Sequence, residues 1–255
     1  MIPALAAFLP VAESTLWAGW WVFLRIGAMM AVLPAFGEQS VPVRVRLGLG
    51  FAFTLVVLPA VAPALPEGAP SLPATGSELL VGLLFGLFLR FFVHVLQIAG
   101  TMAAQSTSLS QIFGASAGVD PMPSMGHVLV MGGLALATIL GLHVRAAEYM
   151  ILSYDLIGPG LRPLAEDVAT IGTAEASRAF ALAFALSAPF VIASLLYNVT
   201  LGVINRAMPQ LMVAFVGAPA ITAGGLALLA IAAPFLLGLW VDALFAFMAD
   251  PFGGP

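Results

Sequence analysis

The chain has 255 residues, of which 62% are hydrophobic and only 8% are charged, and its mean hydropathy is +1.10. A soluble globular chain is nearer half apolar and a quarter charged, so this composition excludes that class and predicts an all-α integral membrane protein. The formal net charge is −4, and no basic cluster suits nucleic acid. The absence of cysteine excludes disulfides, thiolate metal sites and cysteine nucleophiles.

Apolar segments separated by polar or proline-containing breaks follow one another along the chain. We expect about six of them to form kinked helices and helical hairpins. Residues 1–255 are expected to form a single membrane domain with no soluble domain. In chain order the segments cover about 16–36, 47–61, 79–99, 128–142, 180–204 and 211–248.

Two of these segments leave alternatives open. The fourth, 128–142, is short for a span of about 20 residues, so it either ends there or continues towards Tyr154. The last, 211–248, contains several helix breakers and forms either one long kinked span or a hairpin. Between them, 155–177 is the most hydrophilic stretch and is predicted to be a loop.

Polar residues recur every three or four positions through the third segment and beyond it, which places them on one face of a helix. A helix from Leu79 to Gln111 would be about 50 Å long, whereas a bilayer core is about 30 Å thick. The helix therefore breaks near Gly100, leaves the membrane, or is surrounded by protein. Gly82 and Gly86 permit another helix to approach closely. The polar stripe consists of Arg90, His94, Gln97, Thr101, Gln105, Ser108 and Gln111.

Three ionisable residues, Arg25, Arg90 and His94, lie inside apolar runs. A charge at mid-bilayer costs a few kcal/mol, so such residues usually face protein or water. One interpretation is a monomeric secondary transporter with a substrate path along these three residues. The other is a set of hydrogen bonds between helices or subunits. Arg25 needs a carboxylate or carbonyl partner, and because no acid lies one turn away, that partner is distant in sequence or on another chain.

Enzyme motifs do not occur in the sequence. It contains no His-Glu-x-x-His, no Gly-x-Ser-x-Gly and no phosphate-binding loop. The three histidines are scattered and form no helical pair with an acid that would suggest metal ligands. We therefore expect no catalytic, cofactor-binding or metal-binding residues.

A series of short fragments resembles the FliR/SctT family of type III export-gate subunits in order and spacing. The most specific fragment is LGVINRAMPQ at 201–210, and the flagellar branch is closer than the injectisome branch because the Arg-x-x-Pro-Gln and Val-Asp-Pro pieces are both intact. The remaining fragments lie at 23–27, 33–37, 41–48, 97–100, 119–121, 141–143, 153–154 and 215–219. The motif residues expected to serve assembly are Arg25, Arg44, Asp120, Pro121, Arg206, Pro209, Gln210, Gly217 and Pro219.

This resemblance implies a noncatalytic subunit of the flagellar export gate, without a cofactor. The subunit would sit in the bacterial cytoplasmic (inner) membrane at the flagellar basal body, with much of the complex at the periplasmic face. It would assemble with FliP-like and FliQ-like membrane subunits, contact an FlhB-like switch subunit and membrane lipid, and pass unfolded proteins in transit. Its apolar segments would then be hairpins packed against partner subunits.

The resemblance also implies that the loop at 106–125 plugs the lumen. A closed gate needs apolar side chains that exclude water and ions. Ile112 and Phe113 form the bulky apolar pair in a loop of small residues, and Gly114 permits a bend. Met122 or Met125 is expected to help a deformable seal, because methionine adapts to irregular gaps.

Overall fold

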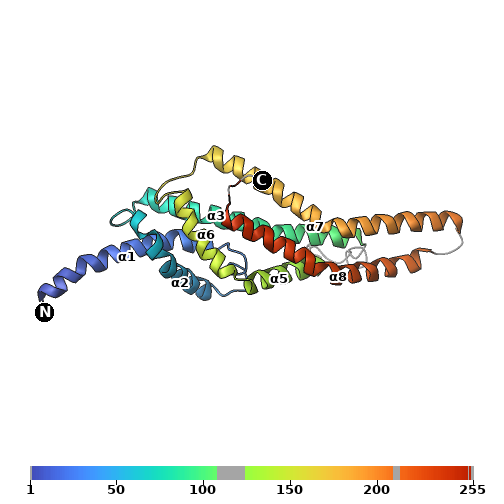
Figure 1. Cartoon of the computed structure of the whole chain (residues 1–255), viewed down its shortest axis with the longest axis horizontal. Coiled ribbons are helices and arrows are strands. Elements are labelled where there is room, and N and C mark those ends of the chain that lie inside the picture. The colour runs from blue at the N-terminus through green and yellow to red at the C-terminus, as the bar shows by residue number, and fades with distance from the viewer. Residues whose placement is uncertain (1, 108–123, 209–212, 252, 254–255) are drawn as a thin grey trace. The chain divides into compact units, whose positions relative to one another are not determined.

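The computed structural model describes residues 2–107, 124–208, 213–251 and 253, and over these ranges the regular secondary structure is entirely helical. Figure 1 shows the helices in chain order. The prediction of an all-α membrane protein is therefore confirmed. The elements are α1 (Ile2–Met30), α2 (Val43–Val61), the 3₁₀ helix η1 (Ala62–Ala64), α3 (Leu72–Ser106), α5 (Ser124–Ile139), α6 (Leu142–Leu156), α7 (Ala165–Ala207) and α8 (Val213–Ala249).

Candidate membrane spans are fewer than the six apolar segments. Within the described part of the chain, four helical stretches are long and apolar enough to cross a bilayer. A fifth is possible if α5 and α6, which are bent by 79° at their junction, count as one broken span. The four stretches are Val43–Ala64, Leu72–Ser106, Ala165–Ala207 and Pro219–Ala249.

The structure decides between alternatives that the sequence left open at α3 and α8, and it corrects the loop predicted at 155–177. Helix α3 continues without a break through Gly100 to Ser106. Helix α7 begins at Ala165, so much of the predicted loop at 155–177 is helical. Helix α8 is one continuous helix that contains Pro219 and Pro234, which excludes the hairpin alternative. Prolines are tolerated in membrane helices because neighbouring groups satisfy the freed backbone atoms.

Local chemistry accounts for several helix ends. The Ser71 hydroxyl accepts a hydrogen bond from the Ala74 amide at the start of α3. Helix α7 carries acidic residues in its first turn and Arg206 in its last, the arrangement that the helix dipole favours. Gly141 lies between α5 and α6 with φ +94°, a left-handed conformation that is strained for residues with a side chain.

The chain packs as two compact units, and α3, α7 and α8 each contribute residues to both. Unit 1 comprises Met1–Phe91, Thr138–Ala174 and Leu244–Pro255. In its core the rings of Phe85 and Tyr149 lie 5.5 Å apart, and the Tyr149 hydroxyl donates to the Phe85 carbonyl at 3.1 Å.

Unit 2 comprises Phe92–Ala137 and Glu175–Ala243. Its largest fully buried side chain is Trp240, whose indole N–H donates to the Phe92 carbonyl at 2.7 Å. A Cβ at Gly133 would lie 3.2 Å from the Trp240 ring, so the glycine leaves room for the indole.

Candidate functional site

The best-defined polar site in the described chain is a buried network around Arg25 of α1. Neither Arg25 nor Glu78 of α3 has any exposed side-chain area. The Arg25 Nε donates to Glu78 Oε2 at 2.7 Å, and Nη2 donates to Oε1 at 3.0 Å. Arg25 also donates to the carbonyls of Ser153, Ile157 and Gly158, at 2.8, 2.8 and 3.4 Å.

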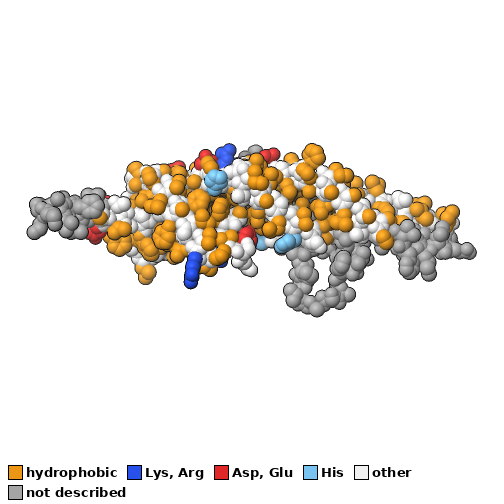
Figure 2. All heavy atoms as spheres, turned by 90° about the horizontal axis from the view of Figure 1, so that it is seen from below, with side chains coloured by type: hydrophobic (Ala, Val, Ile, Leu, Met, Phe, Trp, Pro, Cys, Tyr) orange, Lys and Arg blue, Asp and Glu red, His pale blue; other side chains and the backbone are white. Residues whose placement is uncertain are grey.

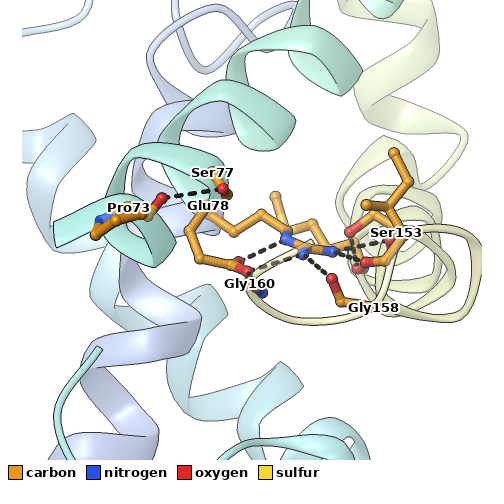
Figure 3. A network of polar contacts seen from close by, with 9 residues as sticks. Pro73, Ser77, Glu78, Ser153, Gly158 and Gly160 are labelled. Carbon is orange, nitrogen blue, oxygen red and sulfur yellow. Dashed lines mark hydrogen bonds and ion pairs between the residues drawn. The ribbon is translucent and has the colours of Figure 1, made fainter. Parts of the chain in front are cut away.

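Figure 3 shows how Glu78 closes this network on the connection between α6 and α7. The Gly160 amide donates to Glu78 Oε1 at 2.7 Å. The ring of Tyr154 covers the guanidinium of Arg25, with its centroid 3.9 Å from Cζ. One ion pair thus ties α1, the start of α3 and the end of α6 together.

This geometry explains why the sequence tolerates an arginine there. The guanidinium has five N–H donors, and five acceptors surround it. Three of the acceptors are carbonyls at or just beyond the end of α6, and those of Ser153 and Gly158 also accept a backbone amide. Arg25 therefore has no N–H left for a substrate carboxylate, which argues against the transporter alternative.

The pair Gly82 and Gly86 brings α1 and α3 into backbone contact beside this network. A Cβ added at Gly82 would overlap the Arg25 carbonyl oxygen and lie 2.9 Å from Ala28 Cβ. A Cβ at Gly86 would overlap Val32 and lie 2.9 Å from the Met29 carbonyl oxygen. The small-residue pair therefore serves packing within this chain.

Arg90, the first residue of the predicted stripe, is also paired. Its Nη1 and Nη2 donate to the two carboxylate oxygens of Glu38 at 2.6 and 3.3 Å. The two side chains are 24% and 23% exposed, so this pair lies nearer the surface than the Arg25 pair.

In unit 2 the stripe continues along α3 as a partly open polar face. His94 is exposed, and its Nδ1 lies 2.8 Å from the Gln97 side-chain oxygen. The Thr101 hydroxyl donates to the Gln97 carbonyl, whereas Gln105 is exposed. The predicted helical phase is thus present on one helix up to Ser106, while the facing of the stripe towards a lumen or subunit stays a prediction.

The end of α3 and the start of α5, which flank the predicted plug, make close contacts within unit 2. At the end of α3, the Ser106 carbonyl accepts a hydrogen bond from Ser194 of α7. Beside it, Thr107 approaches Gly225 of α8, where an added Cβ would lie 2.7 Å from the Thr107 methyl. Near the start of α5, a Cβ at Gly100 would lie 2.5 Å from the Gly126 nitrogen.

The structure describes only some of the predicted site residues. Met125 is buried in α5, Arg44 and Arg206 are exposed, and the carbonyl of buried Gly217 accepts a hydrogen bond from Tyr197 at 2.7 Å. Pro219 lies inside α8 and is exposed. The residues that fall outside the described ranges are Ser108, Gln111, Ile112, Phe113, Gly114, Asp120, Pro121, Met122, Pro209 and Gln210.

Sequence reasoning missed Glu78 and Tyr154. Glu78 lies one position before the apolar segment drawn from Leu79, so a hydropathy window excludes it. The sequence feature that could have indicated Glu78 is Arg25, because it has no acid one turn away and needs a carboxylate from another helix. Over the described residues there is no cluster of three or more His, Asp or Glu side chains able to hold a metal ion.

These features define an all-helical membrane protein whose buried charges hold helices together. The model of the family described as bacterial export proteins, family 1, matches residues 16–247. The chain belongs to this family of FliR-type flagellar export proteins, so the resemblance noted in the sequence is confirmed.

Curated relatives cover most of the chain, and each is named flagellar biosynthetic protein FliR. The protein of Caulobacter vibrioides is 30% identical over 227 residues, which is 87% of this chain and 90% of the relative. That of Escherichia coli K12 is 27% identical over 93% of this chain and 95% of its own length. That of Bacillus subtilis is 26% identical over 78% and 79%.

Proposed function

We propose that this chain is a noncatalytic subunit of a flagellar type III export gate in the bacterial inner membrane. It helps to form and plug a pore for unfolded flagellar proteins. The observation that carries the proposal is the family match over residues 16–247, together with relatives that are all named for flagellar biosynthesis. The buried network fits a structural subunit, because its polar groups are used within the chain.

Helix length supports assembly with FliP-like and FliQ-like subunits and contact with an FlhB-like subunit. Helix α7 has 43 residues and α3 has 35. At 1.5 Å per residue they are about 65 and 52 Å long, whereas a bilayer core is about 30 Å thick. Exposed large apolar side chains nevertheless continue along α7 from Phe180 to Ile204, and Figure 2 shows hydrophobic groups over most of one face. Neighbouring subunits would cover the exposed apolar side chains that lie beyond the bilayer core.

Exposed polar groups on the same helices support an environment other than lipid. His94 and Gln105 are exposed on α3, and Asn198 is exposed among the apolar residues of α7. Polar side chains are costly against acyl chains, so such positions usually face water or protein. An aqueous lumen or a partner subunit meets this requirement.

The proposed plug is the loop at 106–125, with Ile112 and Phe113 as its apolar constriction. It is supported by the close packing of the described residues on either side of 108–123, since Thr107 lies against Gly225 and Gly126 lies against Gly100. Met125 is buried in α5, where its side chain packs within the chain. Of the two methionines expected to help the seal, we therefore propose Met122.

Deletion of the gene followed by complementation tests the function. Loss of secreted flagellar proteins, restored by the wild-type chain, is expected, whereas normal secretion without the chain contradicts the proposal. Deleting Phe113–Ser116 should make the membrane leaky to ions while the complex stays assembled, and unchanged conductance would refute the plug. Glu148→Gln, which removes an exposed ion pair on α6, is the control that should leave conductance unchanged.

A further inference from the structure

We infer that the Arg25–Glu78 ion pair couples membrane insertion of α1 to that of α3. Helix α1 then inserts in its final topology only when Glu78 forms an ion pair with Arg25. The two residues are 53 positions apart, and both side chains are fully buried. The inference concerns how the chain is built, and it holds independently of the proposed export function.

Alone, α1 has no means of neutralising Arg25. Its only acidic residue, Glu13, lies far outside the three- or four-residue spacing at which helical side chains pair. An arginine opposes entry into lipid, so α1 depends on a partner from elsewhere in the chain.

The partners arrive in a fixed order during synthesis. Glu78 is the first, and the carbonyls of Ser153, Ile157 and Gly158 follow at 128 to 133 positions from Arg25. Figure 3 shows Glu78 of α3, Ser153 of α6 and Gly158 of the α6–α7 connection converging on one point. Until α3 has entered, Arg25 is an unpaired charge.

The two members of the pair are not equivalent. Glu78 lies one position before the apolar segment that begins at Leu79, where a charge costs less than it does inside an apolar run. Arg25 lies inside α1 and gains no such help. Loss of Glu78 should therefore misplace α1, whereas loss of Arg25 should leave α1 more apolar and still inserted. A purely stabilising ion pair predicts no such difference in topology.

Cysteine labelling of the full-length chain tests this inference. The chain has no cysteine, so Gln39→Cys places a single thiol at an exposed position between α1 and α2. The protein is synthesised in a cell-free system with membrane vesicles, which avoids degradation, and is labelled by an impermeant maleimide from each side. The background chain is compared with Glu78→Gln, Arg25→Gln, the double variant, and the control Glu148→Gln, which removes an exposed ion pair on α6.

In the Glu78→Gln chain we expect labelling from the opposite side to rise by up to about a hundredfold, the scale on which one intramembrane charge shifts insertion. The Arg25→Gln, double and Glu148→Gln chains should keep one-sided labelling. One-sided labelling in Glu78→Gln would overturn the inference. So would two-sided labelling in all pair variants or in the control, because the defect would then not follow the unpaired arginine.

Discussion

The contact between α1 and α3 gives the sharpest prediction, because it places Gly82 directly against the backbone of Arg25. An added Cβ at Gly82 would lie 2.9 Å from Ala28 Cβ and 3.0 Å from the Arg25 carbonyl carbon, whereas ordinary contacts begin at 3.4 Å. No flexible side chain lies between the helices to relieve this overlap. Gly82→Ala must therefore push α1 away from α3 and strain the Arg25–Glu78 pair.

The magnitude follows from two opposing terms. Replacing a helical glycine with alanine gains about 0.5–1 kcal/mol from backbone entropy. Overpacking a tight contact costs about 1–3 kcal/mol, and disturbance of a buried ion pair adds to it. Gly76→Ala is the matched control in the same helix, because nothing lies within 4 Å of its Cβ. We expect the two variants to differ by about 3 kcal/mol in free energy of unfolding.

Titration of the detergent-purified protein with a denaturing detergent, followed by circular dichroism, measures this difference. Gly76→Ala should be as stable as the parent or more stable, and Gly82→Ala clearly less stable. Equal stability of the two variants would show that α1 does not touch α3 at this point and would refute the packing argument.

Three further results are expected. Tyr154→Phe should not destabilise the protein in the same titration, because the buried hydroxyl has no hydrogen-bond partner within the described structure while its ring still covers Arg25; a loss above about 1 kcal/mol would reveal a partner. Gly100→Ala should lower the yield of folded protein, because its Cβ would meet a backbone nitrogen of α5, whereas Gly132→Ala should be tolerated because only a leucine methyl lies at 3.0 Å. Arg206→Ala should reduce co-purification of partner subunits more than the amount of the chain in membranes, and normal co-purification with loss of the chain would contradict this.

The fold class could be predicted because it depends on composition and on local periodicity. The phase of Arg90, His94, Gln97 and Thr101 correctly indicated one helix face, since three- and four-residue spacing is a local property. The need of Arg25 for a distant partner was also visible. Which carboxylate would meet it was not, because the partners are 53 positions apart and the chain between them folds into other elements.

Helix boundaries predicted from the sequence were wrong where hydrophilic residues are helical. Residues 165–177 are hydrophilic and were assigned to a loop, yet they are rich in alanine and begin with Glu166 and Asp167, which favour a helix start. Hydropathy detects lipid exposure rather than helix propensity. Helix breakers left the last segment open between one kinked span and a hairpin, and the structure has Pro219 and Pro234 inside one helix.

The central claim is that this chain works as one subunit of a multi-subunit export gate. Native mass measurement of the tagged chain, purified in mild detergent from a flagellated bacterium, tests it most directly. The account predicts a particle well above the chain mass of 26.3 kDa that contains FliP-like and FliQ-like subunits. A single chain that transports a small solute into liposomes would contradict the account.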